Sequence, residues 1–165
     1  EFYEAPDAVV HPAPDPPVPI TVGGRSDAAA RRAGRLGDGW LASWCSPRRF
    51  AEGVALAEQA ADDTGRTGVA WRHGYQIWVG LADTPAEGAA LLGPAMQRFY
   101  GAPWSAFERY SPVGTPADIA AWLRPLLEAG AVDLNIAPIA GSSAEAITGL
   151  AEVRRLLVGR LPTGM

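Results

Sequence analysis

The 165-residue sequence contains no lysine, a single cysteine and only two histidines. All 14 basic side chains are therefore arginines, which excludes mechanisms that need a Schiff-base lysine or a P-loop lysine. Because Cys45 is the only cysteine, neither an intrachain disulfide nor a cysteine-based zinc site can form within this sequence. His11 and His73 lie far apart in the sequence, and we expect no metal site.

The sequence also lacks long apolar runs and a strong positive charge. No apolar run approaches the ~18 residues that a membrane span needs, and no signal peptide is visible, so we expect a cytoplasmic protein without membrane contacts. The formal net charge of -4 and the pI of about 5.1 argue against nucleic acid as a partner. A small anionic ligand stays compatible with this charge, because local geometry decides its binding.

What the sequence does contain is a regular alternation of short apolar runs and well-capped amphipathic segments. The apolar runs predict strands and the capped segments predict helices. The predicted strands lie at residues 18–22, 39–43, 75–81 and 132–138, and the predicted helices begin after Ser26, Ser46, Thr84, Thr115 and Ser142. Residues 1–17 are proline-rich and are predicted to form an extended covering segment, which leaves residues 18–165 for the βα units.

Strands that are apolar throughout and are joined by helices are typical of a parallel sheet covered by helices. Four such strands fit either a small doubly wound sheet or one half of an eight-stranded (β/α)8 barrel. The small sheet is self-sufficient, whereas a half-barrel exposes two sheet edges and needs a second half. The residues by themselves slightly favour the small sheet for this reason and leave both α/β architectures open.

Gly23 and Gly24 stand where the first predicted strand turns into the first helix. A helix N-terminus offers free N–H groups and the positive end of the helix dipole to an anion, and glycine lets the anion come close. The alternative is a tight corner that binds nothing. Arg25 is suited either to clamping a phosphate or to a solvated surface position. The pattern is not the glycine fingerprint of dinucleotide-binding folds.

Ser43 and Trp44 follow the second predicted strand, and in a parallel sheet they reach the same edge as Gly23 and Gly24. Trp44 is expected either to stack on a ligand ring or to pack within its loop. Cys45 has no basic neighbour in the sequence, so an inert thiol is expected. His73 precedes a strand and is therefore expected at the opposite end, which argues against a catalytic role.

The stretch PPVPITVGGRSDAAARRAGRLGDGWLAS (16–43) resembles the corresponding segment of the luciferase-like monooxygenases. These are flavin- or coenzyme F420-dependent oxidoreductases with a TIM-barrel fold. The segment EFYEAPDAVVHPAPDPP resembles the hairpin before the family's fifth strand, and QIWVGL resembles the seventh strand. The segment GTPADIAAWLRPLLEAGAVDLNIAP resembles the helix that leads into the eighth strand.

This resemblance implies the C-terminal half of the barrel, strands five to eight, with the first four strands missing from the sequence. It implies FMN or F420 as the cofactor, with the phosphate side at Gly23 and Gly24 and with Ser43 as a further contact. Arg25 and Trp44 are the other candidate cofactor contacts, from their own chemistry. The redox chemistry would belong to the cofactor, so no catalytic side chain is assigned and this half alone is expected to be inactive.

The implied partners are a small organic substrate, the missing N-terminal half-barrel and, as a further option, a second copy in a homodimer. A non-enzymatic α/β module that binds a small phosphorylated ligand is the alternative function.

Overall fold

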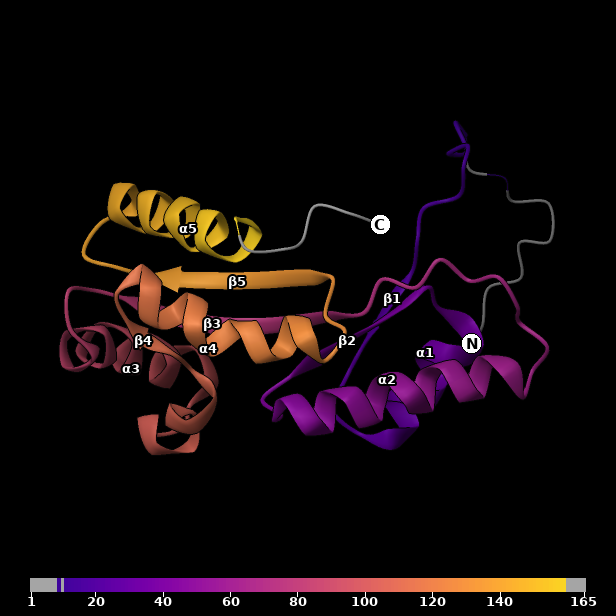
Figure 1. Ribbon diagram of the computed structural model, residues 1–165, viewed down its shortest axis with the longest axis horizontal. Helices are drawn as coiled ribbons and strands as arrows, with labels where there is room; N and C mark the ends of the chain where they lie inside the picture. The colour runs from indigo at the N-terminus through magenta and orange to yellow at the C-terminus, as the bar shows by residue number, and fades with distance from the viewer. Residues whose placement is uncertain (1–8, 10, 160–165) are drawn as a thin grey trace.

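A computed structural model describes residues 9 and 11–159 (Figure 1). The strands are β1 (Thr21–Gly23), β2 (Gly39–Ser43), β3 (Gly74–Leu81), β4 (Val113–Gly114) and β5 (Asp133–Ile139). The helices are α1 (Asp27–Leu36), α2 (Pro47–Asp62), α3 (Pro85–Tyr100), α4 (Pro116–Glu128) and α5 (Ser143–Val158), with short 3-10 turns η1 (Trp104–Ala106) and η2 (Glu108–Tyr110). Within these described residues, no helix is long and apolar enough to cross a membrane.

Each of these five α-helices begins directly after a serine or threonine whose side chain accepts a hydrogen bond from a backbone N–H in the first turn. Thr84 and Thr115 belong to complete capping boxes, because Glu87 and Asp118 reach back to the cap residues. The structure thus confirms the helix starts predicted from the sequence. Of the predicted covering segment 1–17, residues 1–8 and 10 lie outside the described part, and residues 11–17 are exposed without helix or strand.

The sheet is parallel throughout its described pairings and follows the chain order β1-β2-β3-β5. A doubly wound sheet would reverse its strand order at a switch point, whereas consecutive parallel neighbours are the arrangement of a βα barrel. The small extra strand β4 pairs with the C-terminal residues Gly80 and Leu81 of β3. The sequence did not predict this two-residue strand.

The first strand is shorter than the predicted run 18–22. Val18 and Ile20 are exposed, and the N–H of Ile20 donates to the carboxylate of Asp38 instead of a strand neighbour. Backbone pairing with β2 begins only at Thr21 and extends to Gly23. The prediction was wrong at this end because apolar alternation does not reveal where a neighbouring strand begins.

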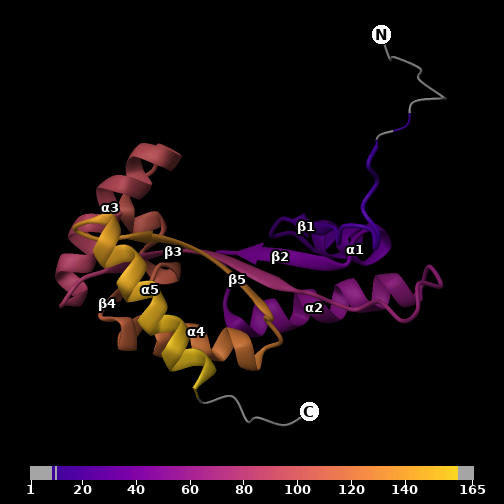
Figure 2. The ribbon, with the colours of Figure 1, turned by 90° about the horizontal axis from the view of Figure 1, so that it is seen from above.

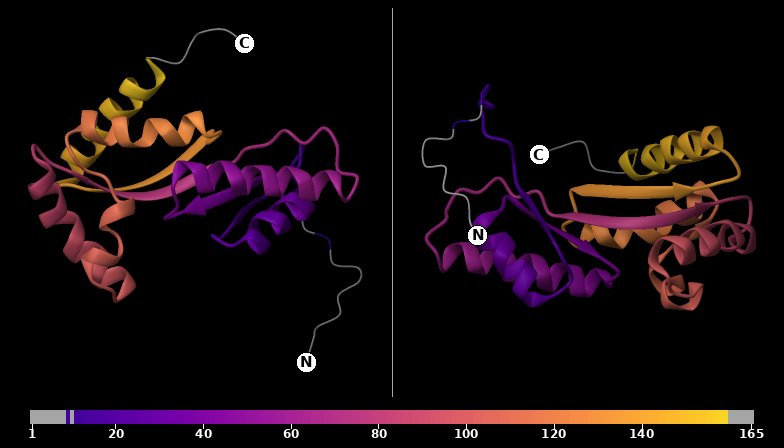
Figure 3. Two further views of the ribbon diagram at one scale, coloured as in Figure 1. Left: turned by 60° about the horizontal axis from the view of Figure 1, so that its bottom comes forward. Right: turned by 180° about the vertical axis from the view of Figure 1, so that it is seen from behind.

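The side chains of β3 alternate between two cores. Tyr75, Ile77, Val79 and Leu81 pack with α1, α2, α4 and α5 on one face. On the other face, Trp78 packs with α3 and the η segments, and Gly80 lies so close to Gly88 of α3 that a Cβ at either glycine would collide with the other's backbone. Figures 1 and 2 show α3 at the end toward which β5 points, and Figure 3 shows α1 and α2 together at the other end of the molecule.

His73 is buried directly before β3, at the N-terminal end of the strand. Its Nδ1 accepts a hydrogen bond from the N–H of Trp40 at 3.2 Å, which leaves the proton of the neutral ring on Nε2. Within the described residues Nε2 has no hydrogen-bond partner, and the Oε1 atom of Glu58 lies 3.7 Å away. Burial lowers the pKa of the His73 imidazole.

This buried imidazole makes stability depend on pH. The folded pKa of His73 lies below the unfolded value of about 6.5, so below that pH the unfolded chain binds more protons and stability falls. We expect the wild-type free energy of unfolding to fall by at most about 1.4 kcal/mol per pH unit below pH 6.5 from this group. His73→Asn should flatten the urea-unfolding profile between pH 7.5 and 5, whereas His11→Gln at an exposed position should not. Coinciding profiles for wild type and His73→Asn would show that His73 does not cause the pH dependence of stability.

Candidate functional site

The corner between β1 and α1 is held by Gly24. Its φ of +138° lies in a region that favours glycine, and an added Cβ would stand 2.7 Å from the Cβ of Ala29. Its N–H donates to the carbonyl of Leu41 at 3.2 Å, and its carbonyl accepts the indole N–H of Trp40 at 2.8 Å. Gly24 is therefore required by the corner itself, independently of any ligand.

Gly23 differs from Gly24, because the space beside it is open. Among the described residues, a Cβ placed on Gly23 would meet no atom within 4 Å, and the residue is exposed. The N-terminus of α1 follows at once, and within the described residues no acceptor is found for the N–H groups of Asp27 and Ala28. The corner thus combines room for a ligand with backbone donors.

The charges around the α1 N-terminus are mixed but positive on balance. A guanidinium nitrogen of Arg49 lies 2.5 Å from the Asp27 carboxylate and donates to the carbonyl of Arg25 at 3.3 Å. The guanidinium of Arg25 lies 5.4 Å from the ring centre of Trp44, a cation–π distance. Two arginines and one carboxylate, together with the helix dipole, favour an anion here.

Trp44 has a left-handed backbone with φ 49°, which costs an L-residue about 1–2 kcal/mol. Its ring packs on Tyr100 and Phe107, with ring centres 4.9 and 5.2 Å apart. The Trp44 ring therefore packs on aromatic side chains of this chain, and the half-buried ring also lies against Arg25. Stacking on a ligand stays a prediction.

The next residue, Cys45, is tied to the central strand. The hydroxyl of Tyr75 accepts a hydrogen bond from the N–H of Cys45 at 3.0 Å and donates to its carbonyl at 2.8 Å. Burial raises the pKa of the Cys45 thiol, and the guanidinium groups of Arg49 and Arg25 oppose this only in part. The sequence missed these arginines as neighbours, although burial keeps the thiol protonated as expected.

The structure brings Gly23, Gly24, Arg25 and Trp44 together at the adjoining ends of β1 and β2. Ser43 ends β2 in register with Gln76 of β3. Sequence reasoning missed two residues that hold these loops, namely Trp40 and Tyr75. The available signal was an aromatic residue with a polar atom in an apolar strand, since a buried indole N–H or phenol hydroxyl usually finds a partner.

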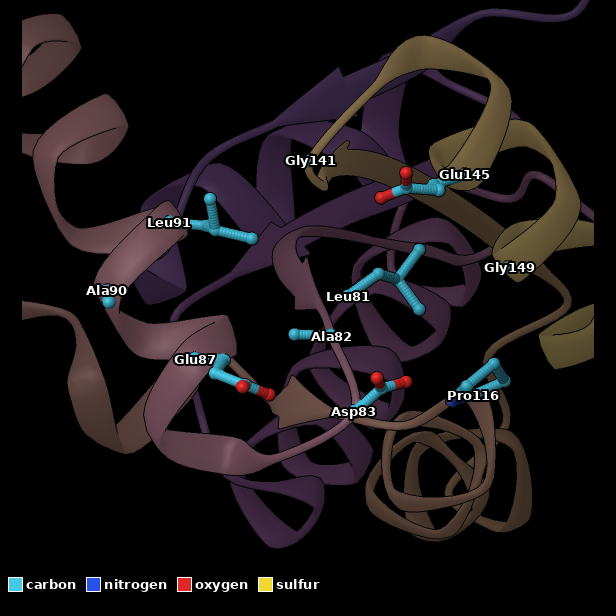
Figure 4. Close-up of a pocket in the computed structure, with 10 residues that line it drawn as sticks. All are labelled: Leu81, Ala82, Asp83, Glu87, Ala90, Leu91, Pro116, Gly141, Glu145 and Gly149. Carbon is cyan, nitrogen blue, oxygen red and sulfur yellow. The ribbon is translucent and has the colours of Figure 1, made fainter.

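A cavity of about 640 Å³ lies at the end of β3, between α3, α4 and α5, and was not predicted (Figure 4). Its wall combines the apolar side chains of Leu81 and Leu91 with the carboxylates of Asp83, Glu87 and Glu145. In the part of the chain that the structure describes, no basic side chain lines it. An anionic ligand is therefore better accommodated at the β1–α1 corner than in this cavity.

Known proteins resemble this chain over different lengths. Uncharacterized proteins of Mycobacterium bovis and Mycobacterium tuberculosis are 40% identical over 67 residues, which is 41% of this chain and 23% of theirs. The structure of an F420-dependent secondary alcohol dehydrogenase with an F420–acetone adduct matches with a TM-score of 0.79 and 16% identity, covering 95% of this chain and 54% of the other.

A third match is the oxygenating constituent of 3,6-diketocamphane monooxygenase from Pseudomonas putida in complex with FMN. It has a TM-score of 0.60 and 18% identity, covering 87% of this chain and 48% of the other. The chain thus spans about half the length of these two structures. Together with the consecutive parallel strands, this coverage confirms the predicted fold, half of a luciferase-like TIM barrel. Since the sequence-family model of the luciferase-like monooxygenases matches residues 1–158, the chain belongs to that family.

Proposed function

We propose that this chain is the C-terminal half of a flavin- or F420-dependent oxidoreductase and that the β1–α1 corner binds the phosphate side of the cofactor. Family membership supports an oxidoreductase over a non-enzymatic binding module. Two similar structures were solved with an F420–acetone adduct and with FMN, so either cofactor is compatible with the fold. The substrate of the proposed reaction is a small organic molecule.

The observation that carries the proposal is the open space beside Gly23, next to the α1 N-terminus. A phosphate there is within the influence of the helix dipole, and its approach meets no side chain of Gly23. Arg25 supplies a cation at the same corner and Ser43 a hydroxyl at the end of the adjoining strand. The residues present therefore fit an anionic cofactor tail.

A bound flavin or deazaflavin supplies the hydride-transfer or oxygen-activating chemistry. In this proposal the chain's own residues bind and orient. Arg25 neutralises phosphate charge, the N–H groups at the start of α1 donate hydrogen bonds to the phosphate oxygens, and Trp44 forms an apolar wall beside them. The remaining wall comes from outside this chain.

A second half-barrel, corresponding to the first four strands of the family's barrel, is the proposed partner. In the described sheet, β1 and β5 each have a neighbour on one side only. Apolar side chains are exposed near both free edges, Val18 and Ile20 before β1, and Val132 and Val158 near β5. Val132 and Val158 also line a cavity of about 580 Å³ beside β5. Such edges and patches favour association, with a homodimer as the second option.

Native mass spectrometry of the purified protein tests this partnership. We expect the chain in a complex that supplies four further βα units, as a separate half or as a second copy. Denatured spectra of the same sample identify the components. A stable monomer of 17.3 kDa that remains folded at high dilution contradicts the proposed partner.

FMN titration followed by ¹⁵N-edited NMR tests the cofactor site and detects weak binding to the half-barrel alone. FMN should shift the amide signals of the β1–α1 corner, and riboflavin, which lacks the phosphate, should bind more weakly. Arg25→Gln should weaken FMN binding by about 10–100-fold, the usual range for hydrogen bonds to a charged group. Arg31→Gln on the exposed face of the same helix is the matched control. Equal losses in both variants, or equal binding of FMN and riboflavin, oppose the proposal.

Substituting the two glycines should have different effects, one on stability and the other on FMN binding. Gly24→Ala should lower the free energy of unfolding by about 1–3 kcal/mol, because its backbone conformation and Ala29 both disfavour a side chain. Gly23→Ala should leave the urea midpoint unchanged and weaken FMN binding by about tenfold, or ~1.4 kcal/mol. A Gly23→Ala protein that binds FMN like wild type shows that the phosphate lies elsewhere.

A further inference from the structure

We propose that Tyr75 is a positioning residue, whose hydroxyl holds the loop after β2 so that the Trp44 ring forms one wall of the cofactor site. The inference deepens the proposed function and, for its effect on binding, rests on it. Its structural part, the closure of the loop by Tyr75, can be measured without any cofactor.

Tyr75 reaches the loop from the helix-side core, which is the core that β3 forms with α1, α2, α4 and α5. Its ring is fully buried and lies edge-on to Phe50, with ring centres 6.0 Å apart. Its neighbour in register on β2 is the small residue Ala42. The Tyr75 side chain extends from there to the C-terminal end of β2. The hydroxyl then bonds both the N–H and the carbonyl of Cys45, at 3.0 and 2.8 Å.

The loop needs such a restraint because it is short and strained. Only Trp44, Cys45 and Ser46 separate the end of β2 from the first residue of α2, and Ser46 is already fixed as the helix cap. Trp44 takes the left-handed conformation just before the residue that Tyr75 grips. Without the hydroxyl, two backbone groups of the buried Cys45 lose a partner and the left-handed turn loses its support.

The conformation of Trp44 determines where its ring lies. In this conformation the ring contacts Tyr100 and Phe107 on the face of the sheet opposite to the helix-side core. Arg25 lies against the same ring, at the β1–α1 corner. The Tyr75 hydroxyl therefore connects the core packed against the helices to the aromatic wall across the sheet. Rotation of the Cys45 peptide would move the Trp44 ring away from Arg25.

The same arrangement occurs one strand earlier. Trp40 is buried in the same core and lies on β2, and its indole N–H donates to the carbonyl of Gly24 in the loop after β1. Each of these two loops is thus held by an aromatic side chain on the following strand. This repetition supports a loop-positioning role for the polar atom of Tyr75 beyond the packing of its ring.

Labelling of the only cysteine measures the closure of the loop directly. Cys45 is buried, so a chromogenic disulfide reagent should react slowly with the folded wild-type protein. Tyr75→Phe keeps the ring and removes both hydrogen bonds, so labelling should accelerate about tenfold or more. Tyr110→Phe is the matched control, since within the described residues its hydroxyl makes no hydrogen bond.

The urea dependence of labelling separates local opening from global unfolding. A locally opened loop exposes little surface, so the accelerated rate in Tyr75→Phe should change little with urea below the unfolding transition. A rate that equals the Tyr110→Phe control overturns the proposal. A rate that rises steeply with urea, as global unfolding does, also overturns it, because Tyr75 would then contribute only to general stability.

A double-mutant cycle tests the link to the site. Tyr75→Phe should weaken FMN binding several-fold in the wild-type background and have no further effect in a Trp44→Ala background, because it acts through Trp44. Equal losses in both backgrounds overturn the positioning role. If the wild-type protein binds neither FMN nor F420, the proposed function fails, whereas the labelling experiment still decides whether Tyr75 closes the loop.

Discussion

The burial of Trp40 is the constraint on which the rest of the site depends. Its ring stacks on Phe50 at 5.7 Å, and Gly53 of α2 faces it so closely that any side chain there would collide with the indole. From this fixed position its backbone N–H bonds His73 at one end of the sheet, and its indole N–H bonds Gly24 at the other. One residue therefore connects the helix-side core to both ends of the strands.

Much of the fold follows from local signals in the sequence. Hydroxyl caps mark the helix starts, and apolar runs locate β2, β3 and β5 to within one residue at each end. The strand β4 was not predictable, because its two residues pair with β3 only where Gly80 and Gly88 let α3 approach the sheet. The early part of the predicted first strand failed for a related reason, since its neighbours are set by tertiary contacts rather than by its own pattern.

The candidate site was predictable to a similar extent. The rule that parallel strands end at one edge correctly placed Gly23, Gly24, Arg25 and Trp44 near one another. It did not distinguish the two glycines, because only the backbone angle of Gly24 and the empty space beside Gly23 assign them different roles. The hydrogen bonds of Trp40 and Tyr75 depend on strand register, which the sequence of a single strand does not contain.

The two loops held by aromatic side chains have a consequence for how substitutions will behave. A change at Trp40 acts on the loop that ends β1, and a change at Tyr75 acts on the loop that ends β2. A substitution on one of these strands therefore affects the loop that follows the preceding strand in the sequence. Defects at the β1–α1 corner can accordingly originate some sixteen residues downstream, as Trp40 and Gly24 illustrate.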